Sequence, residues 1–236
     1  MAGLRGLPAP AFRSRLLNRT WLSRDTFQAE LERPAGFRFQ PGQGIRFRYE
    51  ELEREYSLTS SPEDDVLSLC VRMIDGGRFS PRLAEAEIGS TLAFSGPHGF
   101  FVYRPSGRPT VFVATGTGIA PFVSMARAGA TDFLLVHGAP TGADLHFRFV
   151  MQPAARSYVG CASRELPAGA GSPACRAGRV TDYMRSELPE GLYDFYLCGR
   201  RDMVRDVVGL VDERFSGSVV YSEIFHEGGL PERRLP

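Results

Sequence analysis

Arg54, Tyr56 and Ser57 could together bind a ligand that carries both a phosphate and a flat ring system. The alternation of side chains along an extended strand would place Arg54 and Tyr56 on one face. A guanidinium binds phosphate through two parallel hydrogen bonds, and an aromatic ring can stack on the flat part of the ligand. A partly exposed strand without a binding role explains the same residues, so both interpretations stay open at this point.

A glycine-rich segment, Gly76–Gly77–Arg78–Phe79–Ser80, is the second candidate phosphate site. It precedes a predicted helix over 80–87, with Ser80 as its N-cap and Pro81 at its first position. Backbone N–H groups of a glycine turn and a helix start could bind an anion. The alternative is a hairpin end followed by an ordinary helix start.

The segment Val111–Pro121 is the third candidate, because it predicts a buried strand, a turn at Gly116 and Gly118, and a helix over 119–128. Pro121 fits the first helical turn, where a missing N–H costs little. Such a strand–turn–helix arrangement directs N–H groups and the positive helix end at one place, which suits a phosphate. Its spacing is not GxGxxG, and a tight turn of any α/β domain remains an alternative.

Composition limits the classes of function. The chain has 236 residues, a net charge of +1, 43% apolar residues and four cysteines, and all its basic residues are arginine. This balance favours neither a nucleic-acid partner nor membrane insertion, since no apolar run approaches the roughly 20 residues of a membrane span. The cysteines are too widely spaced for a metal cluster, so no metal site is expected. Because the first residues do not resemble a secretory signal, we expect a cytoplasmic protein.

The first hundred residues predict a small antiparallel β-barrel. Its six short strands, separated by turn residues, are expected near Leu16–Thr20, Thr26–Glu30, Gly44–Tyr49, Glu55–Thr59, Val66–Met73 and Thr91–Ser95. After an RPSGRP linker at 104–109, strands and helices alternate, which predicts an α/β domain with a parallel sheet. We therefore expect a barrel domain over 1–104 and an α/β domain over 105–236.

The second domain is expected to gather its loops at one sheet edge. Strands are predicted over 110–115, 133–138, 157–162, 193–198 and 218–222, helices over 179–187 and 201–214, and a long loop over 163–178. Ligands of an open α/β sheet bind beyond the carboxyl ends of its strands. Gly116–Pro121, Cys198–Arg200 and the loop at Arg164 should all lie there.

The order of several motifs resembles the ferredoxin–NADP(+) reductase family. These are PGQ at 41–43, RxYS at 54–57, the glycine turn before Ser80, GPxGxF at 96–101, GTGIAP at 116–121, CGxxxM at 198–203 and ExF at 223–225. Each motif is weak alone, whereas the ordered set is specific. One departure is Pro140, which stands where many members of the family carry an arginine.

The resemblance implies that the barrel binds FAD. Arg54 would hold the pyrophosphate, Tyr56 would lie against the isoalloxazine, and Ser57 would hydrogen-bond near flavin N5. Further FAD contacts would come from Val71, Arg72, Met73, Gly77, Arg78, Phe79 and Ser80.

The resemblance also implies that the α/β domain binds NADP(H), with NAD(H) as an alternative. Its pyrophosphate and nicotinamide would be held by Thr115, Gly116, Thr117, Gly118 and Pro121, and bordered by Cys198, Gly199, Glu223 and Phe225. Ser163, Arg164 and Arg179 resemble the family's site for the 2′-phosphate, with Arg176 as a possible addition. Ser57, Cys198 and Glu223 would be the catalytic residues.

The implied activity is hydride transfer from NADPH to flavin N5, followed by transfer of single electrons to a protein such as ferredoxin or flavodoxin. The alternatives are an NADH-dependent reductase component of an oxygenase, an electron-transfer subunit of a larger complex, and a non-catalytic flavin-binding subunit. The chain has no CxxxxCxxC run, so we expect the acceptor to be a separate protein.

Overall fold

The computed structural model describes residues 12–49, 52–165 and 175–225, and its first half is an antiparallel barrel. Its strands are β1 (Phe12–Trp21), β2 (Thr26–Glu32), β3 (Gly44–Tyr49), β4 (Leu52–Ser57), β5 (Val66–Arg72) and β6 (Thr91–His98). They pair in the order β4-β3-β6-β1-β2-β5, and a bridge between Leu58 and Leu69 joins the two ends. The predicted antiparallel barrel is confirmed.

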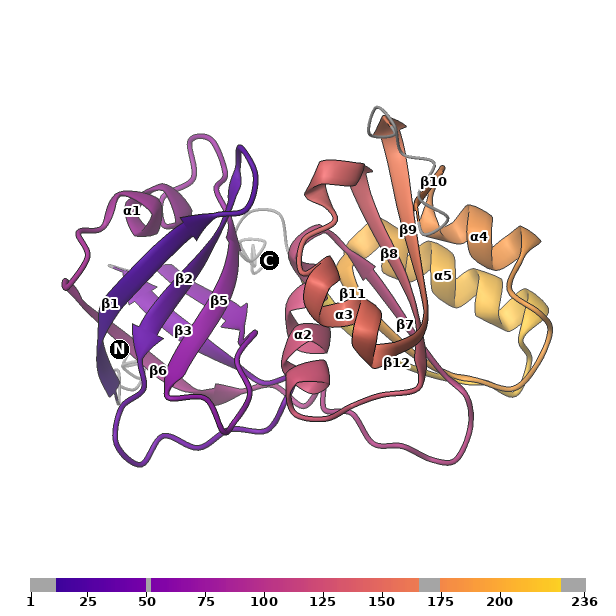
Figure 1. Ribbon diagram of the computed structural model, residues 1–236, viewed down its shortest axis with the longest axis horizontal. Helices are drawn as coiled ribbons and strands as arrows, with labels where there is room; N and C mark the ends of the chain where they lie inside the picture. Colours follow the sequence, from indigo (N-terminus) through magenta and orange to yellow (C-terminus); the bar gives the residue numbers. More distant parts are fainter. Residues whose placement is uncertain (1–11, 50–51, 166–174, 226–236) are drawn as a thin grey trace, which may run out of the picture.

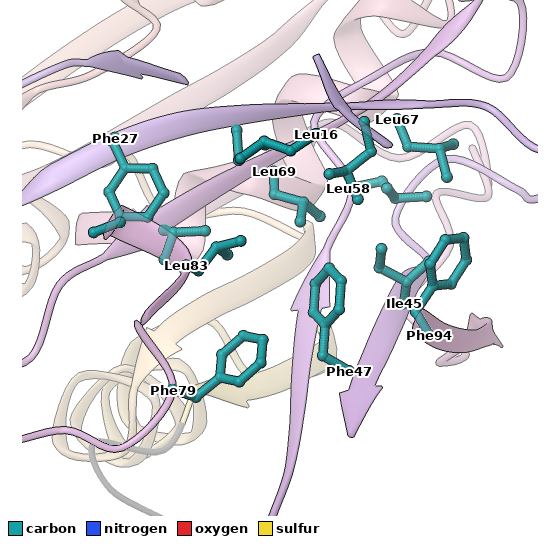
Figure 2. Close-up of a cluster of buried hydrophobic side chains, with 14 of the residues drawn as sticks. Leu16, Phe27, Ile45, Phe47, Leu58, Leu67, Leu69, Phe79, Leu83 and Phe94 are labelled. Carbon is teal, nitrogen blue, oxygen red and sulfur yellow. The ribbon is translucent and has the colours of Figure 1, made fainter. Parts of the chain in front are cut away.

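The barrel encloses a core of leucine and phenylalanine side chains. Alternate residues of its strands point inward, as Phe27, Ala29 and Leu31 do on β2. Figure 2 shows ten labelled members of this cluster, among them Phe47 and Phe94 from neighbouring strands. Phe79, the residue before helix α1 (Ser80–Glu85), and Leu83 within the helix reach the same core. The core thus holds α1 against one end of the barrel.

The predicted N-cap of α1 is wrong by one residue. Phe79 occupies the N-cap position, with no capping hydrogen bond from its side chain, and the helix begins at Ser80 and ends at Glu85. The Ser80 hydroxyl instead accepts a hydrogen bond from the Ile74 N–H at 3.0 Å. It therefore closes the preceding turn rather than capping the helix.

The second half is a parallel sheet with helices on both faces (Figure 1). Its strands are β7 (Thr110–Thr115), β8 (Phe133–Thr141), β9 (Ala155–Glu165), β10 (Cys175–Ala177), β11 (Asp194–Arg200) and β12 (Val219–Phe225), in the order β10-β9-β8-β7-β11-β12. The helices are η1 (Gly116–Ile119), α2 (Ala120–Arg127), η2 (Gly142–Asp144), α3 (Arg148–Ala154), α4 (Val180–Ser186) and α5 (Arg201–Arg214). The α/β fold is confirmed.

Several local predictions in this half need correction. A short 3₁₀ helix, η1, precedes α2, so the α-helix starts at Ala120. The segment 163–178 is not wholly a loop, because β9 continues to Glu165 and β10 pairs with it in parallel. Residues 166–174 lie outside the described part of the chain. Helix α3 and strand β10 had no counterpart among the predicted elements.

Helices α2 and α3 lie between the parallel sheet and the barrel, whereas α4 and α5 cover the far face (Figure 1). Two contacts from α2 join the domains. The buried Ser124 hydroxyl donates to the Ser60 carbonyl at 2.7 Å, and Arg127 donates to the Thr59 carbonyl at 3.2 Å. The carboxyl edge of the sheet is thereby fixed next to the barrel.

No helix among the described residues is long and apolar enough to cross a membrane.

Candidate active site

The turn after β7 packs against the end of β11 at the point where the strand order of the sheet reverses. From β7 the chain proceeds to β8 on one side, while β11 lies on the other. A Cβ on Gly118 would lie 2.3 Å from the Cys198 carbonyl oxygen, and one on Gly199 would lie 2.2 Å from Thr115 Oγ1. Only glycines permit this approach. The predicted crevice residues of the two segments are therefore together, where ligands of such sheets bind.

The same turn leaves its backbone accessible. Gly116 has a φ of +54°, and Gly116 and Thr117 are half-buried rather than fully enclosed. Pro121 lies in the first turn of α2, as expected, and is buried. Thr115 Oγ1 accepts a hydrogen bond from the Arg200 N–H at 3.2 Å, which ties the turn to β11.

Ser57, Cys198 and Glu223 come from three separate strands and meet between the domains. Cys198 and Glu223 are register partners on β11 and β12. The Ser57 hydroxyl, at the end of β4, donates to Glu223 Oε1 at 2.9 Å. Gly99 lies beside the same carboxylate, since a Cβ there would be 3.6 Å from Oε2. The three residues singled out as catalytic thus form one cluster.

Burial dominates the electrostatics of this cluster. It raises the pKa of Glu223 from its ordinary value of 4.5 to about 7, an effect that the Ser57 hydrogen bond opposes and the Glu55 charge reinforces. Burial, and then the neighbouring Glu223 carboxylate, raises the pKa of the Cys198 thiol well above 9.0. Glu223 is therefore poised to exchange a proton near neutral pH, whereas Cys198 stays a thiol.

Phe225 lies two residues beyond Glu223 on β12, in register with Arg200. Its side chain is partly buried against the aromatic cluster that lies on the α2 side of the sheet. The ring therefore borders the carboxyl edge. The chain beyond it is outside the described residues.

In the barrel, a row of aromatic rings brings together the strand that carries Arg54 and the glycine turn before α1, which are the first and second candidate phosphate sites. The Tyr56 ring packs on Phe47 and on Phe79, with centroid distances of 6.0 and 5.9 Å. Arg54 lies on the same strand, close enough to lower the pKa of the Tyr56 hydroxyl, although burial raises that pKa to about 12 overall. Tyr56 thus links Arg54 to the turn that precedes α1.

The turn before α1 is tight enough to require glycine. The Gly77 N–H bonds the Ile74 carbonyl at 2.8 Å, and a Cβ on Gly77 would lie 2.8 Å from that same oxygen. Arg78 is exposed beside it, while Phe79 and Ser80 are buried. The backbone is open at Gly76, where a Cβ would meet nothing within 4 Å, whereas the Gly77 N–H and the Ser80 hydroxyl already serve the turn.

The three predicted contacts at the end of β5 differ in character. The Val71 side chain is fully buried in the barrel core, so only its backbone could face a cofactor. Arg72 is exposed and forms an ion pair with Asp25 at 3.1 Å. Met73 is half-buried, and its N–H donates to the Asp25 carbonyl at 2.6 Å.

The segments proposed for the 2′-phosphate are brought together by β10. Its pairing with β9 places Gly178, whose N–H bonds the Ala162 carbonyl at 2.9 Å, next to Ser163. Ser163 and Arg164 are exposed, as is Arg179, whose N–H donates to Asp182 Oδ2 at 2.7 Å. Arg176, considered as an addition, instead forms an ion pair with Glu187.

Sequence reasoning missed a buried polar group beside the turn after β7. His137, on β8, is fully buried, and its Nδ1 lies 3.0 Å from the Tyr158 hydroxyl of β9. Arg148, at the start of α3, lies over the Tyr158 ring at 5.9 Å. A histidine in the otherwise apolar run FLLVHGA was the signal available in the sequence.

Comparison with known proteins agrees with this geometry. Residues 13–103 match the oxidoreductase FAD-binding domain model and residues 112–209 the oxidoreductase NAD-binding domain model. Ferredoxin–NADP reductase B of Sorangium cellulosum (strain So ce56) is 32% identical over 197 residues, which are 78% of this chain and 80% of that protein. The chain belongs to the ferredoxin–NADP reductase family. It is an FAD-dependent NAD(P)H oxidoreductase that functions in electron transfer.

Two further matches show the breadth of this reductase family. The electron transfer component of toluate 1,2-dioxygenase from Pseudomonas putida is 30% identical over 178 residues, which are 72% of this chain but 53% of that protein. The crystal structure of the Amycolatopsis cytochrome P450 reductase GcoB has a TM-score of 0.76 and 28% identity, covering 95% of this chain and 73% of that one. This reductase therefore shares its two-domain fold with proteins that serve different electron acceptors.

Proposed function

We propose that this protein oxidises NADPH and passes the electrons one at a time to a separate acceptor protein, ferredoxin or flavodoxin. The observation that carries this proposal is the Ser57–Glu223 hydrogen bond of 2.9 Å across the domain boundary, adjacent to Cys198. It unites the barrel, the turn after β7 and the last strand in one site. A non-catalytic flavin-binding subunit would not need a buried carboxyl with a near-neutral pKa at that place.

Bound FAD would accept a hydride from the nicotinamide and release single electrons, and the protein supplies binding and orientation. The residues present fit this cofactor. Tyr56 offers an aromatic ring close to the Arg54 guanidinium, and Gly76, where a Cβ would meet nothing within 4 Å, leaves room for close approach of a pyrophosphate to the backbone. Arg72, Met73, Arg78 and the backbone at Val71 would complete the contacts to FAD.

The turn from Thr115 to Pro121 would hold the pyrophosphate of the nicotinamide coenzyme, and the contact with Cys198 and Gly199 would place the nicotinamide. Such positioning would bring the nicotinamide and flavin rings close together and align them for reaction. Phe225, at the border of the site, would cover the nicotinamide position. Glu223 would exchange a proton through the Ser57 hydroxyl, because burial brings its pKa to about 7.

Preference for NADPH would come from Ser163, Arg164 and Arg179 at the end of β9 and the start of α4. A hydroxyl and guanidinium groups suit a dianionic 2′-phosphate. The name of the Sorangium relative, a ferredoxin–NADP reductase, supports this choice.

We propose that the protein is cytoplasmic. We also propose that the boundary between its two domains lies between residues 104 and 105.

A second candidate is an NADH-dependent reductase component of an oxygenase. The dioxygenase electron transfer component found among its relatives supports it. The Asp182 carboxylate also supports it, because this negative charge lies beside Arg179 and would repel a 2′-phosphate. The chain spans 53% of that relative's length, so the relative has additional parts.

Steady-state reduction of ferricyanide with NADPH and with NADH separates these candidates. We expect the holoenzyme to contain one flavin and to have a kcat/KM at least tenfold higher with NADPH. Arg164→Ala should reduce this preference, because a charge-assisted phosphate contact contributes about 1.5–3 kcal/mol. A preference for NADH that Arg164→Ala leaves unchanged would exclude the 2′-phosphate assignment. Reduction of purified ferredoxin, flavodoxin and an oxygenase component would then identify the acceptor class.

A further inference from the structure

The turn after β7 lacks a positive side chain of its own. Between Arg108 and Arg148 the chain carries a single arginine, Arg127, and no lysine. Arg127 ends α2, at the opposite end of that helix from the turn, and donates to the Thr59 carbonyl at 3.2 Å. A doubly charged pyrophosphate at this turn would therefore depend on backbone N–H groups and on a cation supplied by another element.

Arg148 is the arginine placed to supply that charge. It begins α3, is half-buried, and forms no ion pair with any carboxylate in the described residues. Its buried Nε has no hydrogen-bond partner there. Its carbon Cζ lies 5.9 Å from the centre of the Tyr158 ring. A guanidinium held on an aromatic face, with this donor unused, is prepared to bind an anion.

The neighbours of Arg148 connect it to the turn. The Tyr158 hydroxyl lies 3.0 Å from His137 Nδ1, and His137 lies on β8, in register with Ala114 at the end of β7. The His137 ring is fully buried, and its Nε2 has no hydrogen-bond partner in the described residues. Both the Gly116 backbone and Arg148 are near enough to influence the titration of this ring. Arg148 and the turn are thus both close to one buried imidazole.

Of Arg148, Tyr158 and His137, only Arg148 carries a charge. Burial, and then the neighbouring His146, lowers the pKa of His137 from 6.5 to about 3, against the opposing effect of the Gly116 backbone. The imidazole is therefore neutral at physiological pH. The nearby Asp144 carboxylate is bound by the Thr141 N–H at 3.2 Å and by its hydroxyl at 2.7 Å. On the β11 side of the turn, Arg200 is held by two bonds to Asp202 at 2.9 and 3.0 Å.

We propose that Arg148 binds a pyrophosphate oxygen of the nicotinamide coenzyme held at the Gly116 turn, with Tyr158 and His137 as positioning residues. The proposal rests on the proposed function, because it assumes that this turn holds the coenzyme. Tyr158 orients the guanidinium by stacking, and His137 fixes the Tyr158 hydroxyl. The pyrophosphate is common to NADPH and NADH, so Arg148 contributes to binding of both. The candidates for the 2′-phosphate lie instead at the end of β9.

The test compares Arg148→Gln with Arg156→Gln in the holoenzyme. Arg156 is an exposed arginine near the start of β9, 3.9 Å from Asp132, so its replacement makes the same change in charge away from the carboxyl edge. We expect R148Q to raise KM about tenfold to a hundredfold for NADPH and equally for NADH, with the flavin content unchanged. R156Q should leave both KM values within about twofold of wild type, as expected of an exposed ion pair.

Two conservative variants separate binding from a structural effect. Arg148→Lys keeps the charge without the planar donors, so it should restore part of the affinity. Tyr158→Phe keeps the ring but loses the bond to His137, and should raise KM less than R148Q does. If R148Q yields no folded flavoprotein, a KM of R148K equal to wild type overturns the proposal, and an elevated KM for both coenzymes supports it.

The remaining outcomes are equally distinct. An unchanged KM in R148Q, or an equal rise in R156Q, overturns the role of Arg148 while leaving the proposed function intact. A rise confined to NADPH assigns Arg148 to the 2′-phosphate and also overturns the proposal. Loss of flavin from R148Q, with normal KM in the molecules that retain it, would assign the residue to FAD. If the wild-type holoenzyme oxidises neither coenzyme, the proposed function itself fails.

Discussion

The Glu223 carboxyl binds its proton more tightly in the folded protein than in the unfolded chain. Its pKa is raised from 4.5 to about 7, chiefly by burial. The neutral acid is the form that folding favours, so its contribution to stability is present below about pH 4.5 and is lost as pH rises to 7. A pKa that differs by one between the folded and unfolded states corresponds to about 1.4 kcal/mol. The protein should therefore become less stable by about 3 kcal/mol through this residue between about pH 4.5 and pH 8.

Glu223→Gln tests this directly, because the amide is uncharged at every pH and its oxygen can still accept from Ser57. We expect the difference in melting temperature between E223Q and wild type to grow from pH 5 to pH 8 in favour of the variant. Subtracting the two curves removes the titration of other groups, such as the buried His137. Glu213→Gln, an exposed substitution on α5, is the control and should follow wild type. Parallel curves for E223Q and wild type would contradict a raised pKa.

At the scale of elements, the decisive contact is that of the turn after β7 with β11. Gly118→Ala would place a methyl group 2.3 Å from the Cys198 carbonyl oxygen, so the two strands must separate or the turn must shift. We expect a loss of about 2 kcal/mol or more in the free energy of unfolding, together with weaker coenzyme binding, as for other cases of strained packing. Urea denaturation and the KM for NADPH measure the two effects.

Gly209→Ala is the matched control, since Gly209 lies inside α5 and a Cβ there meets nothing within 4 Å. Alanine is the better helix former, so this change should stabilise the protein by about 0.5–1 kcal/mol. If both substitutions had the same effect, the contact between the turn and β11 would not be the reason for Gly118.

Elements with a strong local pattern could be predicted from the sequence, and those with a weak one could not. All six barrel strands were predicted because their apolar residues alternate and turn residues separate them. Helix α3 was missed because it has seven residues and contains Pro153. Strand β10 has three residues and is defined by pairing with β9. Ser80 was correctly predicted as the start of α1 but wrongly as its N-cap, since its hydroxyl accepts from the Ile74 N–H instead.

At the scale of the whole molecule, the site depends on contacts that local sequence does not encode. Ser57 and Glu223 are 166 residues apart and meet only when the last strand of one domain faces the barrel. The family motifs placed both residues near the flavin and nicotinamide, yet their hydrogen bond and the raised pKa of Glu223 required the structure. Arg148 carried no motif at all. Its significance comes from its position on Tyr158 and from having no carboxylate paired with it in the described part of the chain.

The relative position of the domains should therefore control activity through residues that touch no coenzyme. Ser124 is fully buried on α2 and donates to the Ser60 carbonyl of the barrel at 2.7 Å. Ser124→Ala leaves that oxygen without its partner, which should cost about 1–3 kcal/mol in the free energy of unfolding. Because the Ser57–Glu223 contact spans the same boundary, kcat with NADPH should fall more than the flavin content does. Ser216→Ala, an exposed change after α5, should alter neither quantity. A destabilised S124A with wild-type kcat would show that the domains remain in register without this bond, held by the remaining contacts such as Arg127–Thr59 and Ser57–Glu223.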